Sequence, residues 1–354
     1  MTATTVGAIC DQFPKVLQLQ SGDRDTKVSG PSAPTSPLSG SILFLKDPRL
    51  IGDAVSSSAA VLVVRHSDLE NAALAGAPQA VLASPNPELA LALVARTFFP
   101  PEANRRPFAG ERIHPSAVID ESAEIAEDVI IGPNAVVGAR TRIGSGTIIG
   151  SNTTVESDAS IGDGSHIHPN VYIGYGTQIG KRCEVHPTTA LGSEGFGYAH
   201  DEQFNHYRHV HYGRLILEDD VHVGAGVTID RGHFRDSIIG SGTRIDNHCH
   251  LAHNIQTGKN CLMVADFIAA GTVSIGDNNV FGGRTGVTDH VSIGSNMQFA
   301  GMSSVFKDVD EPGQVLGGHP LQPLKDHLRS YATIAHLPEL RKNVARIMRK
   351  LGMT

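Results

Sequence analysis

An aliphatic residue returns at every sixth position through the middle of the chain. The pattern starts at Ile113 and continues without a break to Leu191, and the residue after each aliphatic position is often Gly. The fifth residue of each hexad is usually small or β-branched. A period of six with small residues at fixed places is typical of a parallel β-helix, in which three hexads make one coil of about 18 residues. We expect the aliphatic side chains to point inward and to stack on their copies one coil away.

This period is interrupted twice. It resumes at Leu217, slips by four residues after Ile229 and ends at Val305. The larger interruption, residues 192–213, has the sequence GSEGFGYAHDEQFNHYRHVHYG and is expected to leave the stack as a loop. Because the scaffold itself does not need such a loop, the loop is a candidate for function. The pattern therefore predicts a mainly β fold, a left-handed parallel β-helix of hexapeptide repeats over residues 111–310.

Different patterns flank the repeat. Residues 1–110 alternate apolar stretches with expected helices, which indicates a small N-terminal α/β domain. Its first 40 residues are rich in Ser, Pro and Gly and are expected to be flexible, and residues 100–110 are the expected linker. After the repeat, residues 311–354 are predicted to be a C-terminal extension of α-helices, because residues 324–351 have helical periodicity.

Composition and charge agree with a stack of short, flat strands. Glycine occurs 38 times, aromatic residues make up only 5% of the chain, and tryptophan is absent. The net charge of −7 gives no general electrostatic reason to bind nucleic acid or an anionic membrane surface. The C-terminal extension is the exception, because its charged residues are mostly basic: Lys325, Arg329, Arg341, Lys342, Arg346, Arg349 and Lys350 against Asp326 and Glu339.

No pattern in the chain predicts a membrane segment. Nowhere do about 18 apolar residues follow one another, and the N-terminus lacks a basic start followed by an apolar run. The four cysteines have no C-x-x-C spacing and are expected to be buried thiols of a reducing compartment. We therefore expect a cytoplasmic protein without stable membrane insertion.

Catalytic chemistry has to come from polar residues that the repeat does not require. His253 takes the third place of its hexad, and His290 takes the fourth place of a hexad two coils later. Gly271 lies 18 residues after His253, hence one coil beyond it. A histidine that removes a proton and a backbone N–H that faces a carbonyl oxygen are what acyl transfer to an amine needs, without a covalent intermediate. The alternative is that these histidines only decorate a corner of the prism.

Other histidines predict less. His206, His209 and His211 in the inserted loop were weighed as a metal cluster, but the residues between them are bulky and no carboxylate or cysteine completes a zinc set. We therefore predict no metal site. His166, His168 and His186 fall at outward-facing places of their hexads and are expected to lie on the surface.

Several motifs together resemble one known family, the UDP-3-O-acylglucosamine N-acyltransferases of lipid A biosynthesis. The resemblance runs from about residue 41 to residue 335 and implies an N-terminal uridine-binding domain, a β-helix, C-terminal helices and a homotrimer with active sites between subunits. It is most specific in GSEGFGYAHD (192–201), TIDRG (228–232), IIGSGTRIDNHCHLAHNI (238–255), GG…DHVSIG (282–294) and EPG…GGHPLQP (311–323).

The resemblance also implies roles for single residues. It makes His253 the general base and Gly271 the oxyanion donor, with His290 assisting at the same site and Asp246 orienting an imidazole. Substrate-binding residues on the same basis are Phe44, Asp47, Phe196, Asn247, Asn254 and Asp266.

The implied reaction moves a 3-hydroxyacyl chain to the 2-amino group of UDP-3-O-acylglucosamine. The acyl donor is an acyl carrier protein, whose 4'-phosphopantetheine thioester is a co-substrate, and no cofactor is bound. An acidic carrier protein suits the basic C-terminal extension. The partners implied are thus the carrier protein, a UDP-linked amino sugar and two further copies of the chain.

At some positions the chain departs from the family pattern. Where the family usually has an aromatic residue, an asparagine and a tyrosine around the uracil, this chain has Phe44, Asp47 and Leu50. Where it tends to have a Gly-Gly pair below the base, the chain has Ala265 and Asp266. These changes leave open a related acyltransferase that uses a different nucleotide-linked amino sugar or acyl donor. A β-helix carbonic anhydrase and a catalytically silent scaffold are further alternatives, and no motif supports either.

Overall fold

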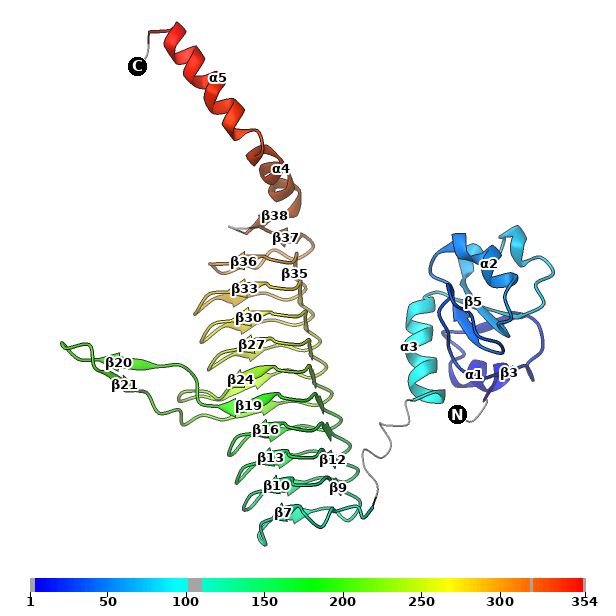
Figure 1. Ribbon diagram of the computed structural model, residues 1–354, viewed down its shortest axis with the longest axis horizontal. Coiled ribbons are helices and arrows are strands. Elements are labelled where there is room, and N and C mark those ends of the chain that lie inside the picture. Colours follow the sequence, from blue (N-terminus) through cyan, green and yellow to red (C-terminus); the bar gives the residue numbers. More distant parts are fainter. Residues whose placement is uncertain (1–3, 101–109, 319–320, 353–354) are drawn as a thin grey trace. The chain divides into compact units, whose positions relative to one another are not determined.

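The structure is a computed structural model that describes residues 4–100, 110–318 and 321–352. The chain forms two compact units, Met1–Pro107 and Phe108–Thr354, and each is described by itself (Figure 1). Except for its two ends, the expected linker at residues 100–110 lies outside the described residues.

The N-terminal unit is built on a four-stranded sheet with the strand order β2-β6-β5-β4. Strands β4, β5 and β6 are parallel, and β2 runs antiparallel to β6. Alternate residues of the strands enter two separate apolar cores, since Leu62 and Val64 belong to one and Val61 and Val63 to the other. The elements are β1 (Thr4–Thr5), α1 (Val6–Gln12), β2 (Gln18–Ser21), β3 (Lys27–Val28), β4 (Ile42–Phe44), η1 (Pro48–Leu50), α2 (Ile51–Val55), β5 (Val61–Arg65), η2 (His66–Asp68), η3 (Ala72–Leu74), β6 (Ala80–Ser84) and α3 (Pro87–Phe98).

Described residues 4–40 belong to this folded unit and place several side chains in its core, so the expectation that they are flexible is wrong. Thr5 caps α1 by accepting a hydrogen bond from the backbone N–H of Ala8 at 3.2 Å. Val6 and Ile9 in this helix are fully buried. The expectation followed the Ser, Pro and Gly content of the segment, and the burial of these few apolar side chains outweighs it.

The second unit is a parallel β-helix with three sheets, which confirms the predicted fold. Through most of the described stack, each coil contributes one short strand to each sheet (Figure 1). The first sheet contains β7 (Val118–Ile119), β10 (Val136–Val137), β13 (Thr154–Val155), β16 (Tyr172–Ile173), β19 (Ala190–Ser193), β24 (Thr228–Asp230), β27 (His250–Leu251), β30 (Ile268–Ala269), β33 (Gly286–Val287) and β36 (Ser304–Val305).

The other two sheets continue each coil. The second sheet contains β8 (Glu124–Ile125), β11 (Arg142–Ile143), β14 (Ser160–Ile161), β17 (Gln178–Ile179), β22 (Leu215–Leu217), β25 (Ser237–Ile239), β28 (Gln256–Thr257), β31 (Ser274–Ile275) and β34 (Ser292–Ile293). The third sheet contains β9 (Ile130–Ile131), β12 (Ile148–Ile149), β15 (His166–Ile167), β18 (Glu184–Val185), β23 (His222–Val223), β26 (Arg244–Ile245), β29 (Leu262–Met263), β32 (Val280–Phe281), β35 (Gln298–Phe299), β37 (Val315–Gly317) and β38 (Gln322–Pro323).

Inward stacking of one aliphatic residue per strand explains the fold. Ile143 pairs with Ile161, 18 residues on, and both are almost fully buried in a core that runs through the stack. Tight corners join the strands, and many contain a residue in the left-handed conformation, such as Asn152 with φ of 58°. Asparagine tolerates this conformation better than most residues. We call the corner after the first sheet the first corner, and those after the second and third sheets the second and third corners.

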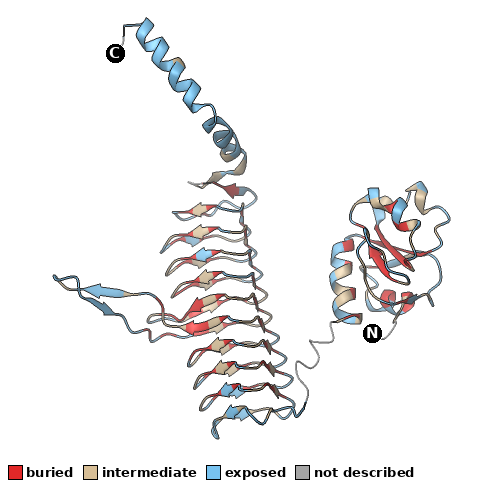
Figure 2. Ribbon diagram, viewed as in Figure 1, coloured by how far each residue is buried: buried red, intermediate tan, exposed pale blue. Residues whose placement is uncertain are grey.

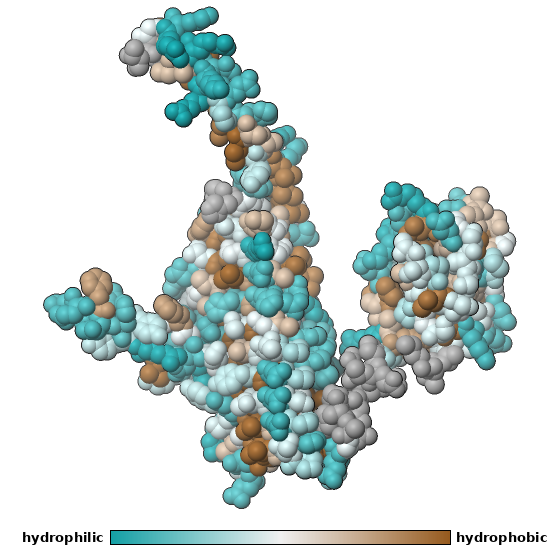
Figure 3. Space-filling model, in the orientation of Figure 1, coloured by the Kyte–Doolittle hydropathy of each residue, from teal (hydrophilic) through white to brown (hydrophobic). Residues whose placement is uncertain are grey.

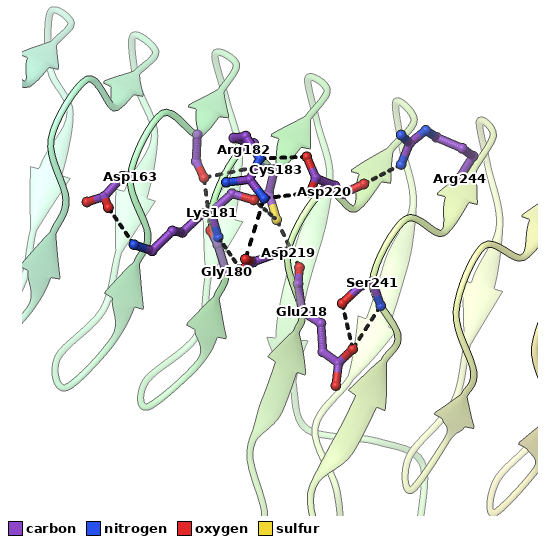
Figure 4. A network of polar contacts seen from close by, with 11 residues as sticks. Asp163, Gly180, Lys181, Arg182, Cys183, Glu218, Asp219, Asp220, Ser241 and Arg244 are labelled. Carbon is purple, nitrogen blue, oxygen red and sulfur yellow. Dashed lines mark hydrogen bonds and ion pairs between the residues drawn. The ribbon is translucent and has the colours of Figure 1, made fainter.

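Exposed polar contacts run along the second corner and link neighbouring coils (Figure 4). The Nζ atom of Lys181 lies 2.8 Å from an Asp163 carboxylate oxygen, and an Arg182 Nη atom lies 2.6 Å from an oxygen of Asp220. The hydroxyl of Ser241 donates a hydrogen bond to Glu218 at 2.8 Å. Such exposed ion pairs each contribute up to about 1 kcal/mol. They therefore favour the correct register more than they stabilise the stack.

Both interruptions of the period leave the stack at the first corner. Residues 192–213 contain the antiparallel hairpin of β20 (Tyr198–His200) and β21 (His206–Arg208), which projects from the prism and is exposed (Figures 1 and 2). Residues 230–236 form a shorter loop before β25, at the point where the frame slips. The expectation that the larger interruption leaves the stack is correct.

Two helices follow the stack, α4 (Leu324–Ile334) and α5 (Leu337–Lys350). Neither has a buried residue among those described, and Figure 3 shows mostly hydrophilic side chains over α5. Among the described residues, no helix is both long and apolar enough to cross a membrane. The four cysteines are buried, as expected, and burial raises the pKa of the Cys183 thiol to about 11.

Candidate active site

Three of the predicted catalytic residues lie on the first corner in successive coils. His253 follows β27, Gly271 follows β30 and His290 follows β33. The backbone N–H of Thr272 donates to the carbonyl of His253 at 2.9 Å, and that of His290 donates to the carbonyl of Gly271 at 3.1 Å. The count of 18 residues per coil therefore brought these residues together correctly, on the same corner as both inserted loops.

Asn254 sets the orientation of the His253 ring. Its side-chain oxygen lies 2.9 Å from Nδ1 of His253 and accepts the backbone N–H of His233 at 3.1 Å. Its Nδ2 donates to the carbonyl of Arg235 at 3.3 Å, which fixes the direction of the amide. An amide oxygen can only accept, so Nδ1 of His253 carries the proton and Nε2 of the neutral ring is the free basic nitrogen. Asn254, assigned to substrate binding above, is buried and positions the imidazole.

Gly271 leaves the space that the imidazole occupies. A Cβ atom added to Gly271 would lie 2.6 Å from Cε1 and 2.7 Å from Nε2 of His253. The backbone of this coil therefore borders the free nitrogen of the base directly. Any larger residue at this position has to displace the ring.

The base of the hairpin covers the other side of His253. A Cβ added to Gly195 would lie 2.9 Å from Cβ of His253 and 3.1 Å from Nε2 of His211. The ring centroids of His211 and His253 are 5.5 Å apart. His211 is 1% exposed, and its Nδ1 has no hydrogen-bond partner among the described residues. Burial lowers the pKa of His211, with a further contribution from His253, so this ring is neutral.

The three loop histidines weighed as a metal cluster have different surroundings. His211 packs beside His253, whereas His209 stacks on His233 at 5.5 Å. His206 lies on exposed strand β21. Among the described residues these three do not form a group with the spacing of metal ligands.

Asp230 supplies a buried carboxylate near the base, which the sequence analysis did not identify. Burial raises the pKa of Asp230, while the nearby His250 and His253 act in the opposite direction. Nε2 of His250 lies 3.9 Å from an Asp230 oxygen, and its Nδ1 is 2.7 Å from the hydroxyl of Thr228. The sequence signal for Asp230 was its position in the TIDRG motif, directly before the four-residue slip of the period.

Arg231, the next residue, joins the hairpin to the stack. It is 1% exposed, its Nε donates to the carbonyl of Gly213 at 2.7 Å, and its guanidinium lies 3.6 Å from the ring centroid of Tyr175. The backbone N–H of Arg231 donates to the carbonyl of Ser193 at 2.9 Å. These contacts hold both ends of the hairpin against the first corner.

Three predicted site residues lie elsewhere, on the third corner. Both Asp246 oxygens accept backbone N–H groups, from Asn247 at 2.8 Å and from Ala265 at 3.1 Å. Asn247 accepts the N–H of Ala225, and Asp266 faces Arg284 at 3.4 Å. Within the single chain, Asp246 does not orient the imidazole of His253. Asp246 follows β26 on the third corner, whereas His253 follows β27 on the first corner. Asn254 orients this imidazole instead.

The remaining predicted residues are exposed or belong to the N-terminal unit. Phe196, near the start of the hairpin, is 83% exposed. Phe44, Asp47 and Leu50 line a cavity of about 510 Å³, which Pro31, Ser32, Ala33, Pro34, Lys46 and Leu91 complete.

Asp47 is already engaged at the edge of this cavity. One of its oxygens lies 2.6 Å from an Arg49 Nη atom, and the other accepts the backbone N–H of Arg49 at 3.0 Å. These hydrogen bonds lower the pKa of Asp47, so the carboxylate is ionised at neutral pH. The cavity edge therefore has a negative charge where the related family usually has an amide.

Comparisons with known proteins agree with the fold and identify the family. The family model described as bacterial transferase hexapeptide (six repeats) matches residues 122–157 and 158–193, and the hexapeptide repeat of succinyl-transferase matches residues 140–175. A solved structure of an Arabidopsis UDP-N-acetylglucosamine acyltransferase has a TM-score of 0.54 at 23% identity, over 65% of this chain and 81% of that chain. At this identity the likeness supports the fold alone.

Curated relatives extend the match beyond the repeats. The UDP-3-O-acylglucosamine N-acyltransferase of Methylococcus capsulatus is 40% identical over 305 residues, which are 85% of this chain and 84% of that protein. Proteins of the same name from Methylorubrum extorquens and Campylobacter curvus are each 41% identical, over 149 residues (42% of each chain) and 143 residues (40% of this chain and 45% of that protein). Because the first of these matches spans most of both proteins, the chain belongs to the UDP-3-O-acylglucosamine N-acyltransferase family and is an acyltransferase.

Proposed function

We propose that this acyltransferase moves a 3-hydroxyacyl chain from acyl carrier protein to the 2-amino group of UDP-3-O-acylglucosamine, a step of lipid A biosynthesis. The observation that supports it most is the orientation of His253. Its Nδ1 is held by Asn254, and its free Nε2 lies against the glycine backbone of the next coil. A fixed neutral imidazole with one free nitrogen suits general-base catalysis near neutral pH.

In this reaction His253 acts first as base and then as acid. Nε2 removes a proton from the substrate's 2-amino group as the amino nitrogen attacks the thioester carbonyl carbon. The tetrahedral intermediate places negative charge on the former carbonyl oxygen, and we assign the backbone N–H of Gly271 to stabilise it. Collapse breaks the carbon–sulfur bond, and the leaving 4'-phosphopantetheine thiolate takes the proton back from the imidazolium. No covalent enzyme intermediate and no bound cofactor is needed.

The surroundings of His253 favour this proton cycle. The buried carboxylate of Asp230 stabilises the transient imidazolium, while the neutral ring of His211 covers one side of the base without competing for the proton. We propose that His290, which is exposed two coils further along the same corner, assists catalysis at the same site.

Other parts of the chain are assigned to the substrates. We propose that the cavity beside Phe44 binds the uridine, because it combines an aromatic wall with polar groups at its edge. The exposed basic residues of α5 suit the acidic surface of a carrier protein. We further propose a homotrimer, which would cover outward apolar side chains of the first sheet such as Val118 and Ile268, 63% and 51% exposed in the single chain.

The test is acyl transfer from 3-hydroxyacyl carrier proteins of several chain lengths to UDP-3-O-acylglucosamine. We expect wild-type turnover with a preferred chain length, and His253→Ala should lower kcat by about 10²–10⁴-fold. His66→Ala is the control, because His66 is an exposed histidine of the N-terminal unit. Full turnover by His253→Ala would show that His253 is not the general base.

A second candidate is transfer to a different nucleotide-linked amino sugar or from a different acyl donor. The Asp47 carboxylate at the cavity edge favours it, because a charged acceptor paired with Arg49 stands where the related family usually has a neutral amide with both a donor and an acceptor. No turnover with any of the carrier proteins by folded wild type, together with turnover on another UDP-amino sugar, would decide for this candidate.

A further inference from the structure

A second group of histidines lies on the third sheet and the third corner, away from the corner that carries His253. His166, Glu184 and His222 occupy the same outward position in three successive coils, because His166 pairs with Glu184 and Glu184 pairs with His222 in the strand register. His168 and His186 occupy matching places on the third corner, one coil apart. Five side chains with metal-binding atoms therefore form a compact array.

All of these side chains lie against the one carboxylate of Glu184. Nε2 of His168 is 3.1 Å from a Glu184 oxygen, and Nε2 of His186 is 3.5 Å from the same oxygen. Nδ1 of His222 is 4.0 Å from the other oxygen. The ring of His168 stacks between His166 at 4.0 Å and His186 at 4.7 Å. These histidines lie at outward positions, as expected, but they pack against one another and are only partly exposed.

The closest donor atoms of the array lie near enough to one another to be candidate ligands of one metal ion. One nitrogen each from His166 and His168 and one oxygen of Glu184 all lie within 4.8 Å of one another. Zn²⁺ bonds of about 2.0–2.2 Å in a tetrahedral site place ligand atoms about 3.3–3.6 Å apart. Because the rings are stacked and a nitrogen lone pair lies in its ring plane, metal binding requires the imidazoles to turn about their side-chain bonds until their nitrogens point at one ion.

The chemistry of the donor atoms also suits a cation. Imidazole nitrogens and a carboxylate oxygen are ligands that zinc and similar divalent metals prefer. Without an ion, the stacked rings of His168 and His186 compete for one oxygen.

We propose that His166, His168 and Glu184 bind one divalent transition-metal ion of the zinc class, with His186 as a fourth ligand. The ligands come from two neighbouring coils, so the ion links these coils and stabilises the stack. The site takes no part in acyl transfer and is independent of the function proposed above.

The test titrates Zn²⁺ and Co²⁺ into tag-free, full-length protein that has been freed of metal with a chelator. We expect one ion per chain, a higher Tm with zinc, and the intense visible absorption of tetrahedral Co²⁺. Glu184→Gln and His168→Ala should each weaken binding at least tenfold. Glu124→Gln and His66→Ala should bind like wild type, because Glu124 is an outward carboxylate on the second sheet and His66 is an exposed histidine of the other unit.

Three outcomes would overturn the proposal, of which the third concerns His253→Ala. One is the absence of saturable one-to-one binding by folded wild type. Another is unchanged affinity in Glu184→Gln, which keeps the shape of the side chain and decides the matter if His168→Ala does not fold. His253→Ala should retain the ion, and loss of binding in this variant would place the metal on the first corner instead.

Discussion

Asn254 controls the protonation geometry of the base more directly than any other contact described. It adopts the left-handed conformation, with φ of 62°, and its amide has partners on both of its polar atoms. An amide oxygen next to Nδ1 fixes which nitrogen is free but adds no net charge. The residue therefore sets the direction of the imidazole without placing a charge beside it.

Replacing this amide by a carboxylate tests the positioning role. Asn254→Asp keeps the shape of the side chain, but its negative charge favours the protonated imidazole. We expect the acidic limb of the kcat/KM profile to move to higher pH and neutral-pH activity to fall on the order of tenfold. The measurement is the pH–rate profile.

Asn260→Asp is the matched control, since Asn260 has the same backbone conformation, with φ of 56°, on the second corner. It should leave the profile unchanged. A purely structural role of Asn254 predicts lower activity at every pH without a shifted limb.

Asp230 predicts a pH-dependent stability with a defined sign. Its pKa is raised in the folded protein, so the folded state binds its proton more tightly than the unfolded chain. The group imposes no cost below the unfolded pKa of about 3.9, and the cost grows as pH rises through the folded pKa. Asp230→Asn removes this ionisable group. The free energy of unfolding of Asp230→Asn, compared with that of wild type, should therefore increase from pH 4 to pH 8.

Urea unfolding of wild type and Asp230→Asn across this range measures the effect, and turnover measured in parallel should fall about tenfold as the imidazolium loses its carboxylate. An Asp230→Asn variant that is less stable than wild type at pH 8 would contradict the assignment of a buried, unfavourable carboxylate.

At the scale of the coil, the site depends on one short backbone segment that approaches the base. Gly271→Ala places a Cβ 2.6 Å from the end of a side chain rather than against backbone. The imidazole can swing away, so we expect Tm to change little and kcat/KM to fall about 10²-fold because the base is displaced. Gly286→Ala is the matched control, because a Cβ there meets nothing within 4 Å. Equal activity of the two variants would contradict the close approach.

The period explains why much of the stack could be predicted from sequence. A strand of two residues has one inward side chain, so the aliphatic frame identifies the core directly, and counting coils put His253, Gly271 and His290 on one corner. Asp246 was assigned from the family resemblance alone, and the same count places it on another corner, because seven residues before His253 is more than one hexad away. A residue's place within its coil therefore matters more than its separation along the chain.

The inserted loops obey no period, and this limited the prediction of the site. His211 packs beside the base and Asp230 lies near it, while Arg231 holds the hairpin to the stack, and only the folded loops show these contacts. The histidine array was within reach of the period, since His168 and His186 are one coil apart. The period alone does not show that outward side chains in neighbouring coils pack against one another rather than into solvent.

At the scale of the whole molecule, the reaction and the nucleotide are assigned to different units. The base lies in the β-helix, whereas the cavity beside Phe44 and Asp47 lies in the N-terminal unit. A change in the cavity should therefore alter the KM of the UDP-linked substrate, while a change at the first corner should alter kcat. This division can be tested without disturbing the fold.

Asp47→Asn makes the test, because it removes a negative charge at the cavity edge and restores the amide that the related family usually has. A UDP group is itself negatively charged, so we expect KM for the UDP-linked substrate to fall about three- to tenfold with kcat unchanged. Loss of the exposed pair with Arg49 should cost at most about 1 kcal/mol of stability. Asp53→Asn, which removes an exposed carboxylate from the first turn of α2, is the control for charge alone. If KM is the same in both variants and in wild type, the cavity does not bind the nucleotide, and the uridine has to be recognised elsewhere.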